Sequence, residues 1–155
     1  MLKTVYVFLL SALLAVPVCG RRGDAPPLAA TCSALPIASA ETKQSICGFY
    51  DTYARVLNDK KTEALLPYIG EAYKGSDGMN AQQIRGAIRQ QMSQFPWRDA
   101  QFKSFALTEN NGAMTIRHKM DVSIPEGRQI AGGETITWAR SAQGNWRIIN
   151  WLHKE

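Results

Sequence analysis

Residues 113–124, AMTIRHKMDVSI, alternate apolar and polar side chains. Because successive side chains of a β-strand point to opposite faces, this stretch predicts a strand with one buried face, on which His118 is the only titratable group. Arg117 and Asp121 would lie on the opposite face. A half-buried strand needs paired neighbours and a second layer over its apolar side, so the rest of the chain must supply both.

Strand-like segments also occur over residues 102–108, 129–140 and 146–153. The segments between the strands supply Gly, Asn and Pro, which tight reversals require, so consecutive strands should pair antiparallel in a meander. Gly132 and Gly133 predict a bulge or sharp bend inside the third strand.

The chain before the strands has helical periodicity. Apolar residues at spacings of three and four predict a helix over residues 42–59, and a shorter helical piece over residues 62–73 would be kinked or divided by Pro67. Asn80 with Gln83 predicts the capped start of a third helix. Helices followed by a bent antiparallel sheet predict an α+β fold.

Together these elements resemble the nuclear transport factor 2-like superfamily, which includes ketosteroid isomerases and polyketide cyclases. The resemblance rests on the element order, on Phe49-Tyr50-x-x-Tyr53 in the first helix and on the terminal Gly144-Asn145-Trp146-Arg147-Ile148. It implies three N-terminal helices packed on a strongly curved four-stranded meander, with a pocket at the open end of this cone. Members use such a pocket for catalysis, for ligand binding or for nothing known, so the fold does not choose a function.

The N-terminus has the layout of a secretory signal, in which a short charged start precedes an apolar run. Val16-Pro17-Val18-Cys19-Gly20 resembles a bacterial lipoprotein box, so we expect cleavage before Cys19 and acylation of that cysteine, which would hold the protein to a membrane. Ordinary cleavage near Gly20 and an uncleaved anchor are the alternatives. An uncleaved anchor would be short, since a membrane span needs about 20 apolar residues.

The expected organisation is a signal peptide over residues 1–18, a flexible tether over 19–40 and a nuclear transport factor 2-like domain over 41–155. The expected location is the cell envelope, as a periplasmic or outer-membrane-associated lipoprotein. A secreted or periplasmic soluble protein is the alternative.

The chain has three cysteines. If Cys19 carries lipid, Cys32 and Cys47 remain as an even pair, which an oxidising compartment would join as a disulfide. Two free thiols, or a buried free Cys47, are the alternatives. No closely spaced His/Cys cluster occurs, so we expect no metal site.

The formal net charge of +5 is mild, and the basic residues are scattered. It is typical of a soluble protein with some attraction to anionic membrane surfaces, and we expect no nucleic-acid partner. No cofactor motif occurs, and neither a phosphate-binding loop nor a nucleophile elbow is present.

Two residues remain as candidates for acid–base chemistry. His118 could act as a general base or contact a ligand, or it could be a core histidine satisfied by a Tyr hydroxyl or a carbonyl. Glu134 is the best available carboxylate, or a solvated charge at a strand end. The candidate ligand contacts inside the cone are Tyr50, Tyr53, His118, Trp138 and Asn150.

In the last strand, alternation places Trp146, Ile148 and Leu152 on one face. Ile149 and Trp151 would then form a second apolar face that something must cover. We therefore expect a homodimer or an envelope protein partner to dock on these two residues.

The function expected from the sequence is that of an exported, lipid-anchored, non-catalytic binding or assembly module of the cell envelope. The alternative is a small-molecule isomerase, dehydratase or cyclase that uses the cone pocket, through His118 with Tyr53 or Glu134. A soluble unanchored carrier is a third possibility.

Overall fold

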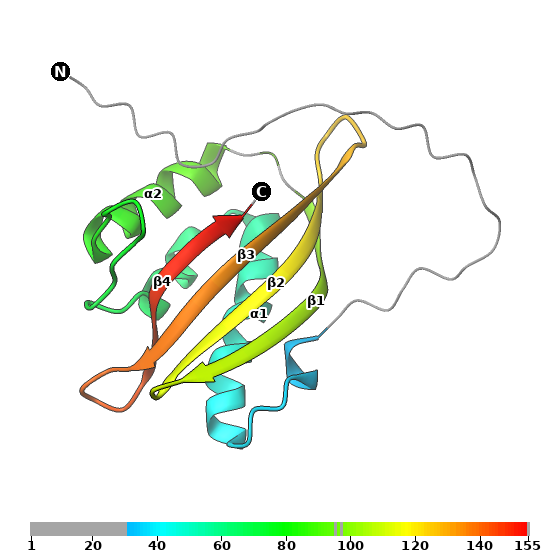
Figure 1. Ribbon diagram of the computed structural model, residues 1–155. Helices are drawn as coiled ribbons and strands as arrows, with labels where there is room; N and C mark the ends of the chain where they lie inside the picture. Colours follow the sequence, from blue (N-terminus) through cyan, green and yellow to red (C-terminus); the bar gives the residue numbers. More distant parts are fainter. Residues whose placement is uncertain (1–30, 95, 97, 155) are drawn as a thin grey trace.

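The computed structural model describes residues 31–94, 96 and 98–154, and the side chain of Lys154 is outside that description. The predicted signal peptide, Cys19 and residues 19–30 of the predicted tether lie outside the described residues. One four-stranded antiparallel sheet curves across α1 (Figure 1). The elements in chain order are η1 (Cys32–Ala34), α1 (Ala40–Asp59), η2 (Thr62–Ala64), η3 (Leu66–Tyr68), α2 (Ala81–Gln94), β1 (Arg98–Asn110), β2 (Ala113–Ser123), β3 (Gln129–Arg140) and β4 (Trp146–Lys154).

The α+β class and the antiparallel meander are confirmed, since the strands lie in the order β1-β2-β3-β4. The helical piece predicted over residues 62–73 is wrong in its detail. Pro67 lies at the start of η3, where a missing N–H is tolerated, and the segment forms two short 3₁₀ turns instead of a helix. Within the described residues, no helix is long and apolar enough to cross a membrane.

Both α-helices begin where local chemistry satisfies their free N–H groups. The Ser39 side chain accepts a hydrogen bond from the backbone N–H of Thr42, which opens α1. Asn80 and Gln83 each accept from the other's backbone N–H, at 3.0 and 2.9 Å, which confirms the predicted capping pair of α2. The aromatic stripe of α1 is buried against the sheet.

The register of the sheet decides which side chains face the helices. β2 and β3 pair without interruption through Gly132 and Gly133, so the bulge predicted there is wrong. Register shifts occur instead near the start of β1 and between β3 and β4, where Trp138 pairs with Ile148 and Thr137 with Asn150, so that Ile149 is an extra residue. An extra residue moves every later side chain to the opposite face.

This shift corrects the predicted faces of β4. Trp146 and Ile148 face the helices as expected, but so does Trp151, whose ring packs at 5.5 Å from Phe49. Leu152 pairs with Thr135 on the outer face instead of lying inside. The apolar face predicted from Ile149 and Trp151 therefore does not form.

The folded unit begins before residue 41, so the predicted boundary of the tether is too late. Cys32, Leu35 and Ile37 are buried in the core, and η1 lies beside α1. A disulfide joins Cys32 to Cys47, as predicted, and links this segment to α1 across a Cα separation of 5.4 Å.

Reduction of the Cys32–Cys47 disulfide should lower the free energy of unfolding by about 3 kcal/mol, because the bond restricts the unfolded chain. Urea unfolding with and without reductant measures this effect. The Cys32→Ser/Cys47→Ser variant is the control, since its midpoint should not respond to reductant. An unchanged wild-type midpoint under reducing conditions would contradict a stabilising bond.

Candidate functional site

The face of the sheet that α1 covers is filled by aromatic rings. Phe49 of α1 packs edge to face against Trp138 of β3 at 5.2 Å, and Tyr50 packs in the same way against His118 of β2 at 5.3 Å. Such edge contacts between ring centroids are favourable beyond the area they bury. Trp138 and Tyr50, two of the predicted ligand contacts, are therefore core residues in this structure.

The carboxylate of Glu134 lies within this aromatic layer. The Tyr53 hydroxyl donates to Glu134, with distances of 3.1 and 3.2 Å to the two carboxylate oxygens. His118 Nε2 lies 3.2 Å from Oε2, and His153 Nδ1 lies 3.6 Å from Oε1. Four side chains from α1, β2, β3 and β4 thus meet at one point, which we call the Glu134 cluster.

The Glu134 cluster is closed to solvent except through His153. Glu134 is 1% exposed, His118 0% and Tyr53 1%, whereas the His153 side chain is 34% exposed. The interpretation of Glu134 as a solvated charge at a strand end is therefore wrong. The continuous pairing of β2 with β3 keeps Glu134 opposite His118 and turned inward.

The electrostatics of the cluster keep Glu134 ionised. Burial by itself raises the pKa of Glu134, but the contacts with His118 and His153 together outweigh burial and hold the pKa at about 2. Burial, and then the Glu134 charge, raise the pKa of Tyr53 well above its ordinary value. At neutral pH the cluster therefore has a carboxylate that accepts from a neutral phenol.

Several buried polar atoms near the cluster have no hydrogen-bond partner among the described residues. His118 Nε2 lies 3.2 Å from Glu134 Oε2 without hydrogen-bond geometry, and His118 Nδ1 has no partner. The Tyr50 hydroxyl and the indole N–H groups of Trp138 and Trp151 are also unpaired. An unpaired buried polar group costs about 1–3 kcal/mol, so these atoms would gain from a water or a ligand.

His153 and Trp151 are the members of this interior that sequence reasoning missed. Both depend on the extra residue Ile149, which a simple alternation does not reveal. Asn150, in contrast, was predicted inside the cone and is not there. It lies on the other side of β4, where its Nδ2 donates to the Lys74 carbonyl at 2.9 Å.

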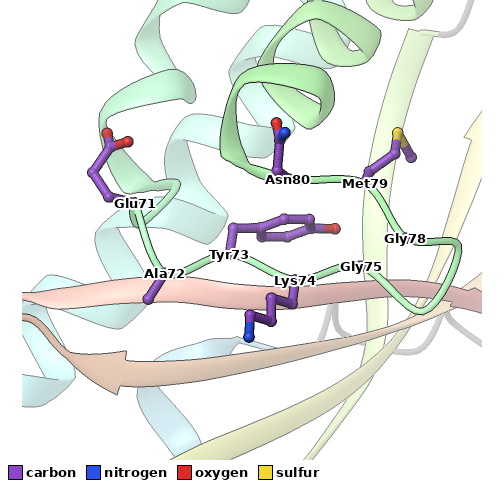
Figure 2. A pocket seen from close by; sticks show the side chains of 8 residues that line it. All are labelled: Glu71, Ala72, Tyr73, Lys74, Gly75, Gly78, Met79 and Asn80. Atoms are coloured by element: carbon purple, nitrogen blue, oxygen red, sulfur yellow. The ribbon is translucent and has the colours of Figure 1, made fainter.

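The described surface has hollows outside the aromatic layer. One of about 470 Å³ lies at the loop of residues 71–80, where Figure 2 shows the Tyr73 and Lys74 side chains on opposite sides of the chain. A second, of about 490 Å³, lies over β2 and β3, and a third, of about 440 Å³, adjoins the β1–β2 turn. Tyr50, Tyr53 and Trp138 line none of these three.

Within the described residues, no group of three or more His, Cys, Asp or Glu side chains is placed to hold a metal ion. The Glu134 cluster holds a buried negative charge, and its member His153 reaches the surface. It has no described opening through which a substrate could reach Tyr53.

The four-stranded meander over α1 is an α+β fold similar to that of solved nuclear transport factor 2-like proteins. A nuclear transport factor 2-like protein of unknown function from Pseudomonas putida is similar, with a TM-score of 0.62 and 8% identity over 75% of this chain and 87% of that one. Aln2 from a Streptomyces species is similar with a TM-score of 0.58 and 12% identity, over 77% of this chain and 93% of its own.

A protein of unknown function with a cystatin-like fold from Nostoc punctiforme has a TM-score of 0.57 and 15% identity, over 74% of this chain and 91% of that one. These identities show the fold alone. No family profile matches the sequence, and no curated protein does.

Replacing Glu134 should destabilise the domain strongly. Glu134→Gln should lower the free energy of unfolding by about 3–5 kcal/mol, because it removes the buried carboxylate that Tyr53, His118 and His153 all contact. Chemical denaturation measures the loss, and Glu126→Gln, in the exposed β2–β3 turn, is the matched control and should change it by about 0.5 kcal/mol or less.

The Glu134→Gln variant should also differ from the wild type in how its stability depends on pH. The pKa of Glu134 is lowered from 4.5 to about 2 in the folded protein, so its stabilisation is complete above pH 4.5 and is lost as the pH falls toward 2. The wild type should therefore lose stability more steeply than Glu134→Gln across that range. Parallel losses in the two proteins would contradict the assigned role of the carboxylate.

Proposed function

We propose that this chain is an exported, lipid-anchored module of the cell envelope that binds or assembles through its surface and performs no chemistry inside its cone. The observation that carries this proposal is the closure of the Glu134 cluster, since Tyr53, His118 and Glu134 are each 1% exposed or less. Tyr53 lines none of the three described hollows, and His118 and Glu134 border only the hollow over β2 and β3. A carboxylate with a pKa of about 2 is also a poor general base at neutral pH.

The membrane attachment in this proposal rests on Cys19 and the apolar leader before it. Cys19 lies outside the described residues, so the support is the sequence alone. The disulfide between Cys32 and Cys47 is compatible with an oxidising compartment outside the cytoplasm, because such bonds are rare where thiols are kept reduced.

A homodimer or an envelope partner remains part of the proposal, with a smaller contact than the sequence suggested. Trp151 is turned toward Phe49 and Tyr53, so it does not offer its ring to a partner. Ile149 is half-buried, and Leu152 is half-buried on the outer face beside Thr135. These two residues are the apolar contribution of β4 to such an interface.

A second candidate function has one specific observation in its favour. The unpaired His118 Nδ1, the Tyr50 hydroxyl and the two indole N–H groups surround a buried acid–base pair, which is the composition expected of a ligand site. If the cone opens, a small-molecule isomerase, dehydratase or cyclase could use these groups. Perturbed titratable groups also occur in purely structural networks, so opening is the deciding question.

The two histidines of this chain report directly on that opening. Hydrogen–deuterium exchange at the imidazole C2 position, followed by mass spectrometry at pH 8, should be at least about tenfold slower at His118 than at His153, since local burial slows exchange. His153 is the internal control. Equal rates would contradict a sealed cone and favour the enzyme.

Membrane attachment should depend on Cys19. In fractionated cells the wild type should sediment with membranes, resist a high-salt wash and dissolve in detergent, since stable anchoring needs two or more acyl chains. Cys19→Ser should be released into a soluble fraction, and Cys47→Ser, which alters a different cysteine, should remain attached. Full-length wild type recovered with its leader intact among cytosolic proteins would overturn the proposal.

A further inference from the structure

The outer face of the sheet carries a hollow that the interior cluster does not use. It has a volume of about 490 Å³, and its lining comes from β1, β2 and β3. The register explains why it exists. Arg117 and Lys119 of β2 pair with Thr135 and Gly133 of β3, so two long cationic side chains stand beside a strand with short side chains or none.

The charges in this hollow are unbalanced. Lys103 Nζ lies 3.4 Å from Asp121 Oδ2, so that cation has a counter-charge. Arg117 and Lys119 make no ion pair or side-chain hydrogen bond with another described residue, and both are exposed. The carboxylate of Glu134 does not compensate them, because it points to the opposite face of β3, toward His118 and Tyr53.

An independent observation indicates that the hollow takes a ligand. Thr135 is 9% exposed and lines the hollow, and its hydroxyl is buried without a hydrogen-bond partner among the described residues. A small side-chain movement would let this unpaired hydroxyl donate to an acceptor atom in the hollow. The guanidinium of Arg117 and the ammonium of Lys119 are donors as well. The groups of the hollow that have no partner are therefore all hydrogen-bond donors, and a ligand with acceptor oxygens would satisfy them.

We propose that this hollow binds a phosphate group, either of a lipid headgroup or of a free phosphorylated molecule. Two cations and a hydroxyl arranged around one space suit a tetrahedral anion with several acceptor oxygens better than a flat carboxylate with two. His118 and Glu134 also border the hollow, but the Glu134 carboxylate is held on the inner face by Tyr53 and His118, and the hollow does not involve Cys19. Its ligand class deepens the proposed binding function and rests on it, although the hollow does not depend on the lipid anchor.

The test uses the mature chain, residues 19–155, with Cys19→Ser, so that neither the apolar leader nor an acyl chain contributes to binding. Inorganic phosphate is titrated by NMR, and vesicles of phosphatidylglycerol or of phosphatidylcholine are tested by co-sedimentation. Binding to phosphate or phosphatidylglycerol is the expected result, with weaker binding to phosphatidylcholine, because the choline ammonium repels Arg117 and Lys119. Phosphatidylglycerol alone identifies a headgroup as the source, and free phosphate identifies a small molecule.

Three variants decide whether binding occurs in the hollow. Arg117→Gln/Lys119→Gln should weaken binding at least about tenfold, whereas Arg55→Gln/Lys61→Gln, which removes the same charge from the helical side, should weaken it about twofold or less. Ala131→Leu fills the hollow without changing charge and should weaken binding several-fold.

Three outcomes would overturn the proposal. The first is the absence of binding to both probes. The others are an equal loss of binding in the two charge variants and full binding by Ala131→Leu, since either would mean that diffuse surface charge, and not the hollow, attracts the ligand. None of these outcomes bears on Cys19, so a failure here is separable from a failure of membrane anchoring.

Discussion

The buried carboxylate of Glu134 is the constraint on which the arrangement of this domain depends. An isolated charge in an apolar interior is expensive, so it must be compensated by groups brought from elsewhere in the chain. Tyr53 comes from α1, His118 from β2 and His153 from β4. The Glu134 carboxylate thereby constrains three parts of the fold. These are the position of α1, the register of β2 with β3, and the end of β4.

This compensation also explains why an acid–base cluster can be present without an evident activity. The contacts with both histidines hold the pKa of Glu134 low although burial opposes them, and a low pKa favours a stable ion pair over proton transfer near neutral pH. The aromatic rings around the cluster complete the closure. The proposed binding therefore falls on the outside of the sheet, where two cations and a buried hydroxyl have no partner among the described residues.

The sequence predicts those parts of the fold that local periodicity controls. The alternation around His118 and the stripe of α1 were interpreted correctly, because each depends on residues two to four positions apart. The prediction for the face of Trp151 is wrong, because the extra residue Ile149 is defined only by the pairing of β4 with β3. Alternation does place Glu134 inward, but its three partners belong to other elements, so one strand cannot show that the charge is compensated. The segment of residues 32–37 is too short for its hydrophobic periodicity to predict that it is buried.

Gly132 and Gly133 leave space on opposite faces of the sheet. Neither has the positive φ that would require glycine for conformation, so the reason for the pair is space. A Cβ at Gly132 would lie 3.7 Å from His153 Cε1, which is ordinary contact, and any longer side chain would push the imidazole away from Glu134. Gly133 faces the other way and leaves room beside Lys119. The absence of a side chain at Gly132 thus leaves room for His153 on the inner face. The absence of one at Gly133 leaves room for the cationic hollow on the outer face.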